Sequence, residues 1–412
     1  MGDPRSVTLA LQRRPQLSPG IEDLLEDLLW PILLRAASLS IRPGRVATGI
    51  LALLVSVLLS RLARLWSGEP DPLTDLGTRA RRLALEAGGE ALRLDLDGML
   101  RSLWELALAP ARTLLADPVS TVVVLPLIVG VAVIPLGAIC RVAACEVSHG
   151  SILPVREGLA FAARRWLSLV GAFVVPVVLA GLIVGVLALF GAALLSLAYV
   201  DVVGGVLFGG AVVLGAVGVV VIGVSLLALP MLVPVVVCEG TDAIDAVQRA
   251  FAYVMLRPLR FAAYSAILLA QGLVVFVVVA FVADRAVWLA GRATTAIPIP
   301  HAKDVVARAQ DARVGAEGES NPGLAARSLA FWGNAAGLAV GGWVVSYVCC
   351  AGTLLYLAMR RVCDGQDVEE LWSPGMIEAT MARTMRARAE VAPPKAAATA
   401  REVLAPDERD DD

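Results

Sequence analysis

Two long runs without a charged residue, 167–200 and 202–238, constrain this chain more than any other feature. Each run is far longer than a buried helix of a soluble domain, and about 18 or more consecutive apolar residues are typical of a membrane-spanning helix. Composition agrees, because only 17% of the residues are charged, against about 25% in an average soluble domain. The sequence therefore excludes a soluble enzyme, a disulfide-stapled secreted domain and a disordered protein. It predicts an all-α, polytopic membrane bundle.

The apolar segments predict six spans within a membrane domain that covers residues 21–388. A flexible N-terminus, 1–20, precedes this domain, and a disordered tail, 389–412, follows it. The first apolar run, 46–60, is shorter than the roughly 20 residues that a span needs, so a helix lying in the membrane surface is the alternative there. The predicted spans are residues 46–64, 119–140, 167–195, 206–229, 261–282 and 337–359, with polar outer loops at 67–118 and 284–327.

The short connections predict the orientation of the chain. Connections 141–166 and 239–260 contain several arginines, whereas the connection around Asp201 contains no lysine or arginine. Short loops rich in basic residues stay in the cytoplasm, so we expect these two connections and both termini on the cytoplasmic side. Lysine occurs only at Lys303 and Lys395, an arginine bias typical of GC-rich bacteria. We therefore expect a bacterial cytoplasmic membrane protein.

A unit recurs along the chain, beginning near residues 21, 151 and 242. Each copy starts with an amphipathic stretch that ends in basic residues, and each closes with a span that ends in a cysteine followed by an acid. An amphipathic helix of this kind lies in the membrane plane with its apolar face among the headgroups. We therefore predict a threefold internal repeat of in-plane cytoplasmic helix, span, outer loop and span. The closing pairs are Cys145-Glu146, Cys238-Glu239 and Cys363-Asp364.

The basic residues that end the amphipathic stretches are candidate contacts for lipid headgroups, because arginine pairs well with phosphate. The alternative is that the closing acids cap the next helix or pair with Arg141, Arg249 or Arg361. A ring of these acids around a cation is a further, weaker reading. The candidate lipid contacts are Arg42, Arg45, Arg164, Arg165, Arg257 and Arg260.

One segment of the chain resembles a known element. An apolar span that contains Pro234 ends at Glu239-Gly240, and a helix then leads to Arg257 and Arg260. This segment resembles an element of bacterial six-span membrane proteins of unknown function, related to the membrane domain attached to some glycerophosphodiester phosphodiesterases. The resemblance implies topology and not activity. The catalytic barrel of those enzymes is absent, because no stretch of this chain is long and polar enough to form it.

Small and polar residues within the spans provide further candidates. Glycines spaced four apart let helix backbones approach closely, so we expect them in helix packing within the bundle or between two copies. Gln271 and Asn334 are candidate intramembrane polar residues, which form either an interhelical hydrogen bond or the lining of a pathway. The candidate packing glycines are Gly181, Gly185, Gly333, Gly337 and Gly341, with Gly205 and Gly209 in the same pattern.

Function is much less constrained than topology. The sequence lacks a metalloprotease motif, a nucleophile elbow and a phosphate-binding loop, and His149 beside Glu146 is at most a partial metal site. We expect no catalytic residue, no cofactor and no metal. The expected partners are the lipid bilayer, other membrane proteins or a second copy, and no nucleic acid. A membrane scaffold or accessory protein is the first hypothesis, a transporter or permease for a lipid or apolar solute the second, and an interfacial enzyme the third.

Overall fold

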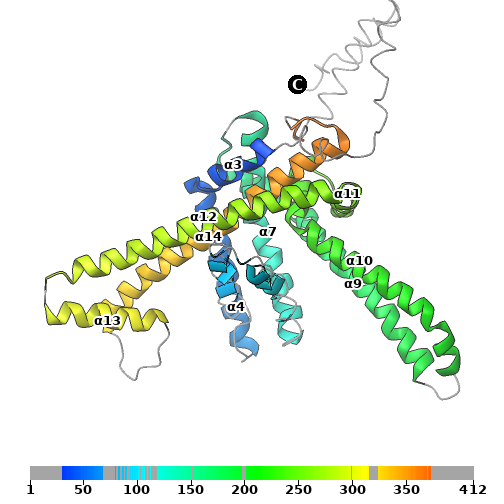
Figure 1. Cartoon of the computed structure of the whole chain (residues 1–412), viewed down its shortest axis with the longest axis horizontal. Coiled ribbons are helices and arrows are strands. Elements are labelled where there is room, and N and C mark those ends of the chain that lie inside the picture. Colours follow the sequence, from blue (N-terminus) through cyan, green and yellow to red (C-terminus); the bar gives the residue numbers. More distant parts are fainter. Residues whose placement is uncertain are drawn as a thin grey trace, which may run out of the picture.

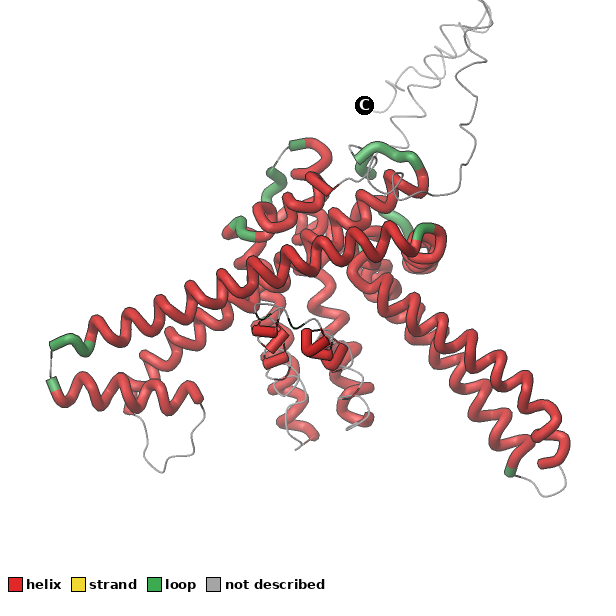
Figure 2. Tube along the Cα trace, viewed as in Figure 1, coloured by secondary structure: helices red, strands yellow, loops and turns green. Residues whose placement is uncertain are grey.

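The structure, a computed structural model, describes most of the chain between residues 30 and 372. The predicted flexible N-terminus, most of the predicted outer loop at 67–118 and the predicted tail lie outside the described residues. The predicted all-α class is confirmed, since no described residue lies in a strand (Figure 2). The described residues are 30–67, scattered positions between 79 and 112, 118–150, 152–196, 201–297, 299–314, 323–368 and 370–372.

The helices are arranged as three sets, each with one short helix followed by two long ones. This is the order that the sequence predicts for the repeated unit. The first set is α3 (Trp30–Ser40), α4 (Pro43–Ser67) and α7 (Pro118–His149). The second is α8 (Val155–Arg164), α9 (Trp166–Phe190) with its π-helical extension η2 (Gly191–Leu195), and α10 (Asp201–Glu239). The third is α11 (Ala243–Leu256), α12 (Pro258–Thr294) and α14 (Gly323–Asp364), with α13 (Pro300–Val314) between the last two.

Six of the described helices are long and apolar enough to cross a membrane, so the chain is a multi-pass membrane protein. The helix α4 has 25 residues, about 37 Å at 1.5 Å per residue. The first span is therefore long enough to cross, because its helix continues beyond the apolar run into Arg61 and its neighbours.

The other long helices also extend past the apolar runs that predicted them. The helix α10 has 39 residues, because it includes the whole uncharged run 202–238. The helix α14 has 42, because charged residues near its start do not stop a helix. The predicted polar loop 284–327 is largely helical for the same reason. The connection expected around Asp201 does not include this residue, since Asp201 is the first residue of α10.

The long helices form hairpins that diverge from one common end (Figure 1). The α9–α10 hairpin and the α12–α14 hairpin point in different directions, and the α4–α7 hairpin lies between them. The short helices α3 and α11 lie near the point of divergence. We call this region the vertex. Most of the hydrophobic core lies there, and residues such as Ala143, Val236 and Leu357 are fully buried at the ends of α7, α10 and α14.

The glycines divide into packed and unpacked sets. Gly333 is buried, and a Cβ on Gly341 would lie 2.9 Å from Leu53 Cδ1, so the sixth span does pack through small residues. The expectation of packing within the chain is wrong for the other candidates as far as the described residues go, because a Cβ added to them would meet none of their atoms within 4 Å. They lie on faces that the described part of the chain does not cover. These glycines are Gly181, Gly185, Gly205, Gly209 and Gly337.

Candidate functional site

Charged and hydroxyl side chains gather at the vertex, where the three hairpins meet. They come from the junction of α3 and α4, from the ends of α7, α10 and α14, and from α11. We call this set the vertex cluster. Its members are Arg42, Arg45, Arg141, Glu146, Glu239, Arg249, Tyr253, Tyr356, Arg360 and Asp364.

Glu146, which closes the first unit, receives both arginines at the start of α4. Arg42 and Arg45 each form an ion pair with it, and Arg45 Nη1 also donates to the carbonyl oxygen of Leu39 at 2.6 Å. The side chain of Arg45 is only 2% exposed. The expectation that Arg45 contacts lipid headgroups is therefore wrong, because its guanidinium is buried against α7. The side chain of Arg42 remains 41% exposed.

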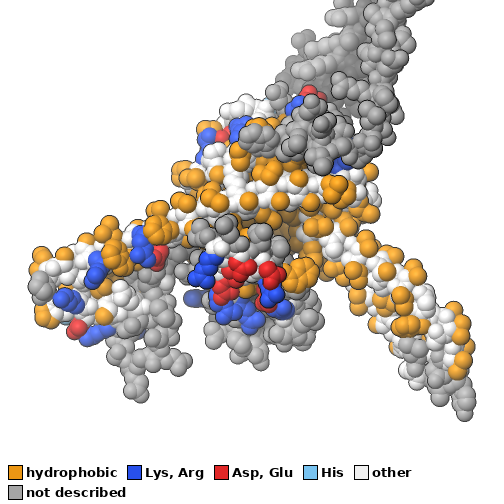
Figure 3. Space-filling view, viewed as in Figure 1, with side chains coloured by type: hydrophobic (Ala, Val, Ile, Leu, Met, Phe, Trp, Pro, Cys, Tyr) orange, Lys and Arg blue, Asp and Glu red, His pale blue; other side chains and the backbone are white. Residues whose placement is uncertain are grey.

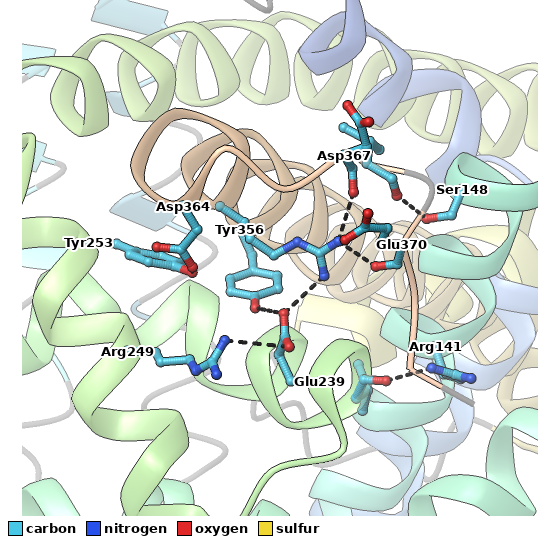
Figure 4. Close-up of polar contacts among 12 residues, drawn as sticks. Arg141, Ser148, Glu239, Arg249, Tyr253, Tyr356, Asp364, Asp367 and Glu370 are labelled. Atoms are coloured by element: carbon cyan, nitrogen blue, oxygen red, sulfur yellow. Dashed lines mark hydrogen bonds and ion pairs between the residues drawn. The ribbon is translucent and has the colours of Figure 1, made fainter. Parts of the chain in front are cut away.

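Glu239, which closes the second unit, joins that unit to the third (Figure 4). Its Oε1 accepts hydrogen bonds from Tyr356 Oη at 2.6 Å and from Arg360 Nη1 at 2.9 Å. Its Oε2 lies 3.4 Å from Arg249 Nη1, so the predicted alternative of a pair between these two residues is confirmed. Arg360 is 2% exposed and also donates to the carbonyl oxygen of Asp367 at 2.8 Å. Glu239 thus links the ends of α10, α11 and α14.

Asp364, which closes the third unit, accepts a hydrogen bond from Tyr253 of α11. Burial raises the pKa of the Tyr253 hydroxyl, and the hydrogen bond to Asp364 raises it further. The hydroxyl therefore remains protonated and keeps its donor role. Each closing acid of the repeat is thus held by arginine or tyrosine side chains from a neighbouring helix.

The described residues that follow α14, 365–368 and 370–372, cross the vertex and connect the units. Ser148 Oγ donates to the carbonyl oxygen of Val368 at 2.6 Å, and Arg141 Nη2 donates to that of Trp372 at 2.8 Å. The backbone N–H of Trp372 donates to the carbonyl oxygen of Cys238 at 3.0 Å. The ring of Trp372 lies against Gly240, where an added Cβ would come within 2.5 Å of it. We call this segment the strap.

The remaining candidate arginines lie at the α8–α9 and α11–α12 junctions. Arg164 and Arg257 are exposed. Arg165 is half-buried, and its guanidinium lies 4.8 Å from the ring centre of Trp372. Contacts of Arg164, Arg257 and Arg260 with lipid headgroups stay predictions, as does that of Arg42.

Gln271 and Asn334 do not share one interior surface. Gln271 Nε2 donates to the carbonyl oxygen of Leu34 at 2.7 Å, and its Oε1 accepts from Tyr347 Oη at 3.3 Å. The interpretation of Gln271 as an interhelical hydrogen-bonding residue is therefore confirmed, because it links α12 to α3 and α14. Asn334 lies on an exposed face of α14.

The geometry suits the joining of helices better than chemistry on a substrate. The carboxylate of Glu146 is occupied by two arginines, and His149 beside it is exposed. Within the described part of the chain, no group of three or more His, Cys, Asp or Glu side chains could hold a metal ion. The closing acids were predictable from the sequence, because they repeat. Arg360, Tyr356 and the strap were not, because they follow no spacing pattern.

No protein-family model, functionally described protein or solved structure matches this chain.

Proposed function

We propose that this protein is a membrane scaffold, which holds apolar hairpins at a fixed vertex and presents them to other membrane proteins. One observation carries the proposal. The spans of α9, α10 and α12 have only 11%, 11% and 6% of their most apolar windows buried within the chain, against 61% for α7 and α14. The α9–α10 hairpin, and the α12 side of the α12–α14 hairpin, are therefore fixed at one end and left uncovered by the described part of the chain along most of their length.

The uncovered surface is large and without charge on the α9–α10 hairpin. Figure 3 shows hydrophobic and uncharged side chains along this hairpin, with no acidic or basic side chain on the face in view. Val177 and Val219 are each 71% exposed. Helices of another membrane protein can pack on such a surface through the small residues Gly181 and Gly185, where backbones approach closely.

A pathway lined by Gln271 and Asn334 would favour the transporter hypothesis. Gln271 is instead occupied at both ends by α3 and α14, and Asn334 is exposed. A transporter also needs its repeats to move against one another. The vertex cluster opposes such movement, because buried ion pairs and the strap connect all three units. These features favour the scaffold.

We further propose that the vertex lies in the cytoplasm of a bacterium, with both termini on that side. The vertex cluster contains more arginines than carboxylates, and excess positive charge stays on the cytoplasmic face. In this orientation the tips of the hairpins, near Ser196 and Ile297, lie outside.

A photo-crosslinking amino acid on the α9–α10 hairpin tests the scaffold. Placed at Val177 or Val219 in native membranes, it is expected to give discrete protein adducts whose masses are the same in repeated preparations, because partner helices cover these exposed positions. Ile183 is the matched control, since it is 7% exposed and packs on Gly218 inside the hairpin. Its expected products are internal. Mass spectrometry distinguishes protein from lipid adducts, and lipid adducts alone at both exposed positions would overturn the scaffold.

A further inference from the structure

We infer that a pocket at the start of α4 binds the phosphodiester of an anionic lipid. This inference goes beyond the scaffold, because it assigns a ligand to a site that the hairpin surfaces do not include. The pocket has a volume of about 260 Å³ and opens between the α3–α4 junction and the segment that leads into α8. Its lining residues are Arg42, Pro43, Gly44, Arg45, Val142, Ile152, Leu153 and Val155.

The positive charge around the pocket favours the binding of an anion. Arg42 and Arg45 both pair with the single carboxylate of Glu146, so the group carries one positive charge in excess. The side chain of Arg45 is 2% exposed, and its Nε has no hydrogen-bond partner among the described residues. Glu146 compensates one of the two arginines, so one positive charge is left over beside the partly exposed Arg42. An anion that binds next to Arg42 would balance this charge.

The backbone at the same place favours a phosphate. The first N–H groups of a helix have no partner within it and carry partial positive charge. Pro43 is the first residue of α4 and has no N–H, so Gly44 provides the first such donor. A Cβ on Gly44 would lie 3.1 Å from Val155 Cγ2. The absence of a side chain therefore lets Val155, a lining residue of the pocket, pack closely against the start of α4.

The walls of the pocket indicate which source of phosphate fits. Val142, Leu153 and Val155 are apolar, and Ile152 at the pocket is 65% exposed. Inorganic phosphate gains nothing from such walls, whereas the glycerol and first methylenes of a lipid bury apolar surface against them. The pocket also lies at the end of α4, a span, where headgroups reach it. A lipid phosphate therefore fits better than free phosphate.

The test is lipid binding to the purified full-length protein in detergent, with native mass spectrometry as the readout. Phosphatidylglycerol, phosphatidylcholine and inorganic phosphate are added separately. We expect one tightly held phosphatidylglycerol, weaker phosphatidylcholine and no competition by millimolar inorganic phosphate. Arg42→Gln is expected to weaken phosphatidylglycerol binding about fivefold, the equivalent of about 1 kcal/mol for one arginine at a membrane surface. Arg35→Gln, on the exposed face of α3, is the control for general surface charge and should bind as the wild type does.

A second pair of variants does not alter the Glu146 ion pairs. Ile152→Glu places a negative charge at the pocket and should reduce phosphatidylglycerol binding at least as much as Arg42→Gln. Ile152→Gln, of equal size, should retain binding within about twofold, because it changes no charge. Equal binding of the two lipids, or full binding by Ile152→Glu, would overturn the site. Displacement of the lipid by inorganic phosphate would show that free phosphate is the ligand and would overturn the lipid assignment.

Discussion

Replacement of Glu239 by glutamine is expected to lower the free energy of unfolding by about 3–5 kcal/mol, the range for removing one partner of a buried ion pair. Glutamine keeps an acceptor for Tyr356 but carries no charge. Arg360, which is 2% exposed, would then remain as a buried charge without a counterion. Arg249 is 40% exposed, so water can solvate its guanidinium. The loss of its ion pair with Glu239 therefore contributes little to the change in stability. Reversible chemical unfolding in detergent micelles measures the change.

Asp242→Asn is the matched control for Glu239→Gln. Asp242 lies in the same connection, is exposed, and makes no side-chain hydrogen bond at the start of α11. We expect its substitution to change stability by less than about 0.5 kcal/mol. If the two variants were equally stable, Glu239 would not be holding α10, α11 and α14 together, and the vertex would not be rigid.

Gly342→Leu is expected to separate α4 from α14 and to lower the free energy of unfolding by about 3 kcal/mol, at the upper end of the range for overpacking. A Cβ at position 342 would lie 2.4 Å from Ile50 Cγ1 and 3.0 Å from the carbonyl oxygen of Val46. A backbone atom cannot move aside as a flexible side chain can. The neighbouring hydrogen bond from Ser346 Oγ to the carbonyl oxygen of Ser40, 2.9 Å long, would be lost with the contact.

Gly337→Leu on the same helix is the comparison. No atom of the described residues lies within 4 Å of a Cβ at position 337, so the leucine should be tolerated in the isolated protein. Thermal unfolding followed by circular dichroism measures both variants. A loss of stability at position 337 as large as that at 342 would contradict the exposed placement of this face of α14.

The fold was predictable to the level of helices and their order. Apolar length predicts the spans, because a bilayer imposes a minimum length on any crossing helix. Repetition of the Cys-acid pairs predicts the three units. The structure agrees with this, because each closing acid contacts arginine or tyrosine side chains at the vertex. The helix ends were not predictable from apolarity, because a helix can continue into charged sequence, as α12 and α14 do.

The partners within the vertex were not predictable from the sequence. Glu239 contacts Tyr356 and Arg360, which lie more than a hundred residues further along the chain, and no local periodicity records such a contact. The strap has no recognisable sequence pattern either. Its backbone carbonyl groups accept the hydrogen bonds from Ser148 and Arg141, and every residue has such a group. Gly342 was missed because the GxxxG pattern pointed to Gly337 and Gly341, whereas the backbone of α4 comes close to α14 one residue further on.

We expect three hairpins to cross the membrane from one shared vertex. Labelling of single introduced cysteines with a membrane-impermeant maleimide distinguishes the two sides of the membrane. The native cysteines are buried or half-buried, so the wild-type chain provides the baseline. Ser196→Cys and Ile297→Cys, at exposed hairpin tips, should react in intact cells, and Ile152→Cys, at the vertex, only after permeabilisation. Reaction of Ser196→Cys and Ile152→Cys from the same side of the membrane would contradict the account.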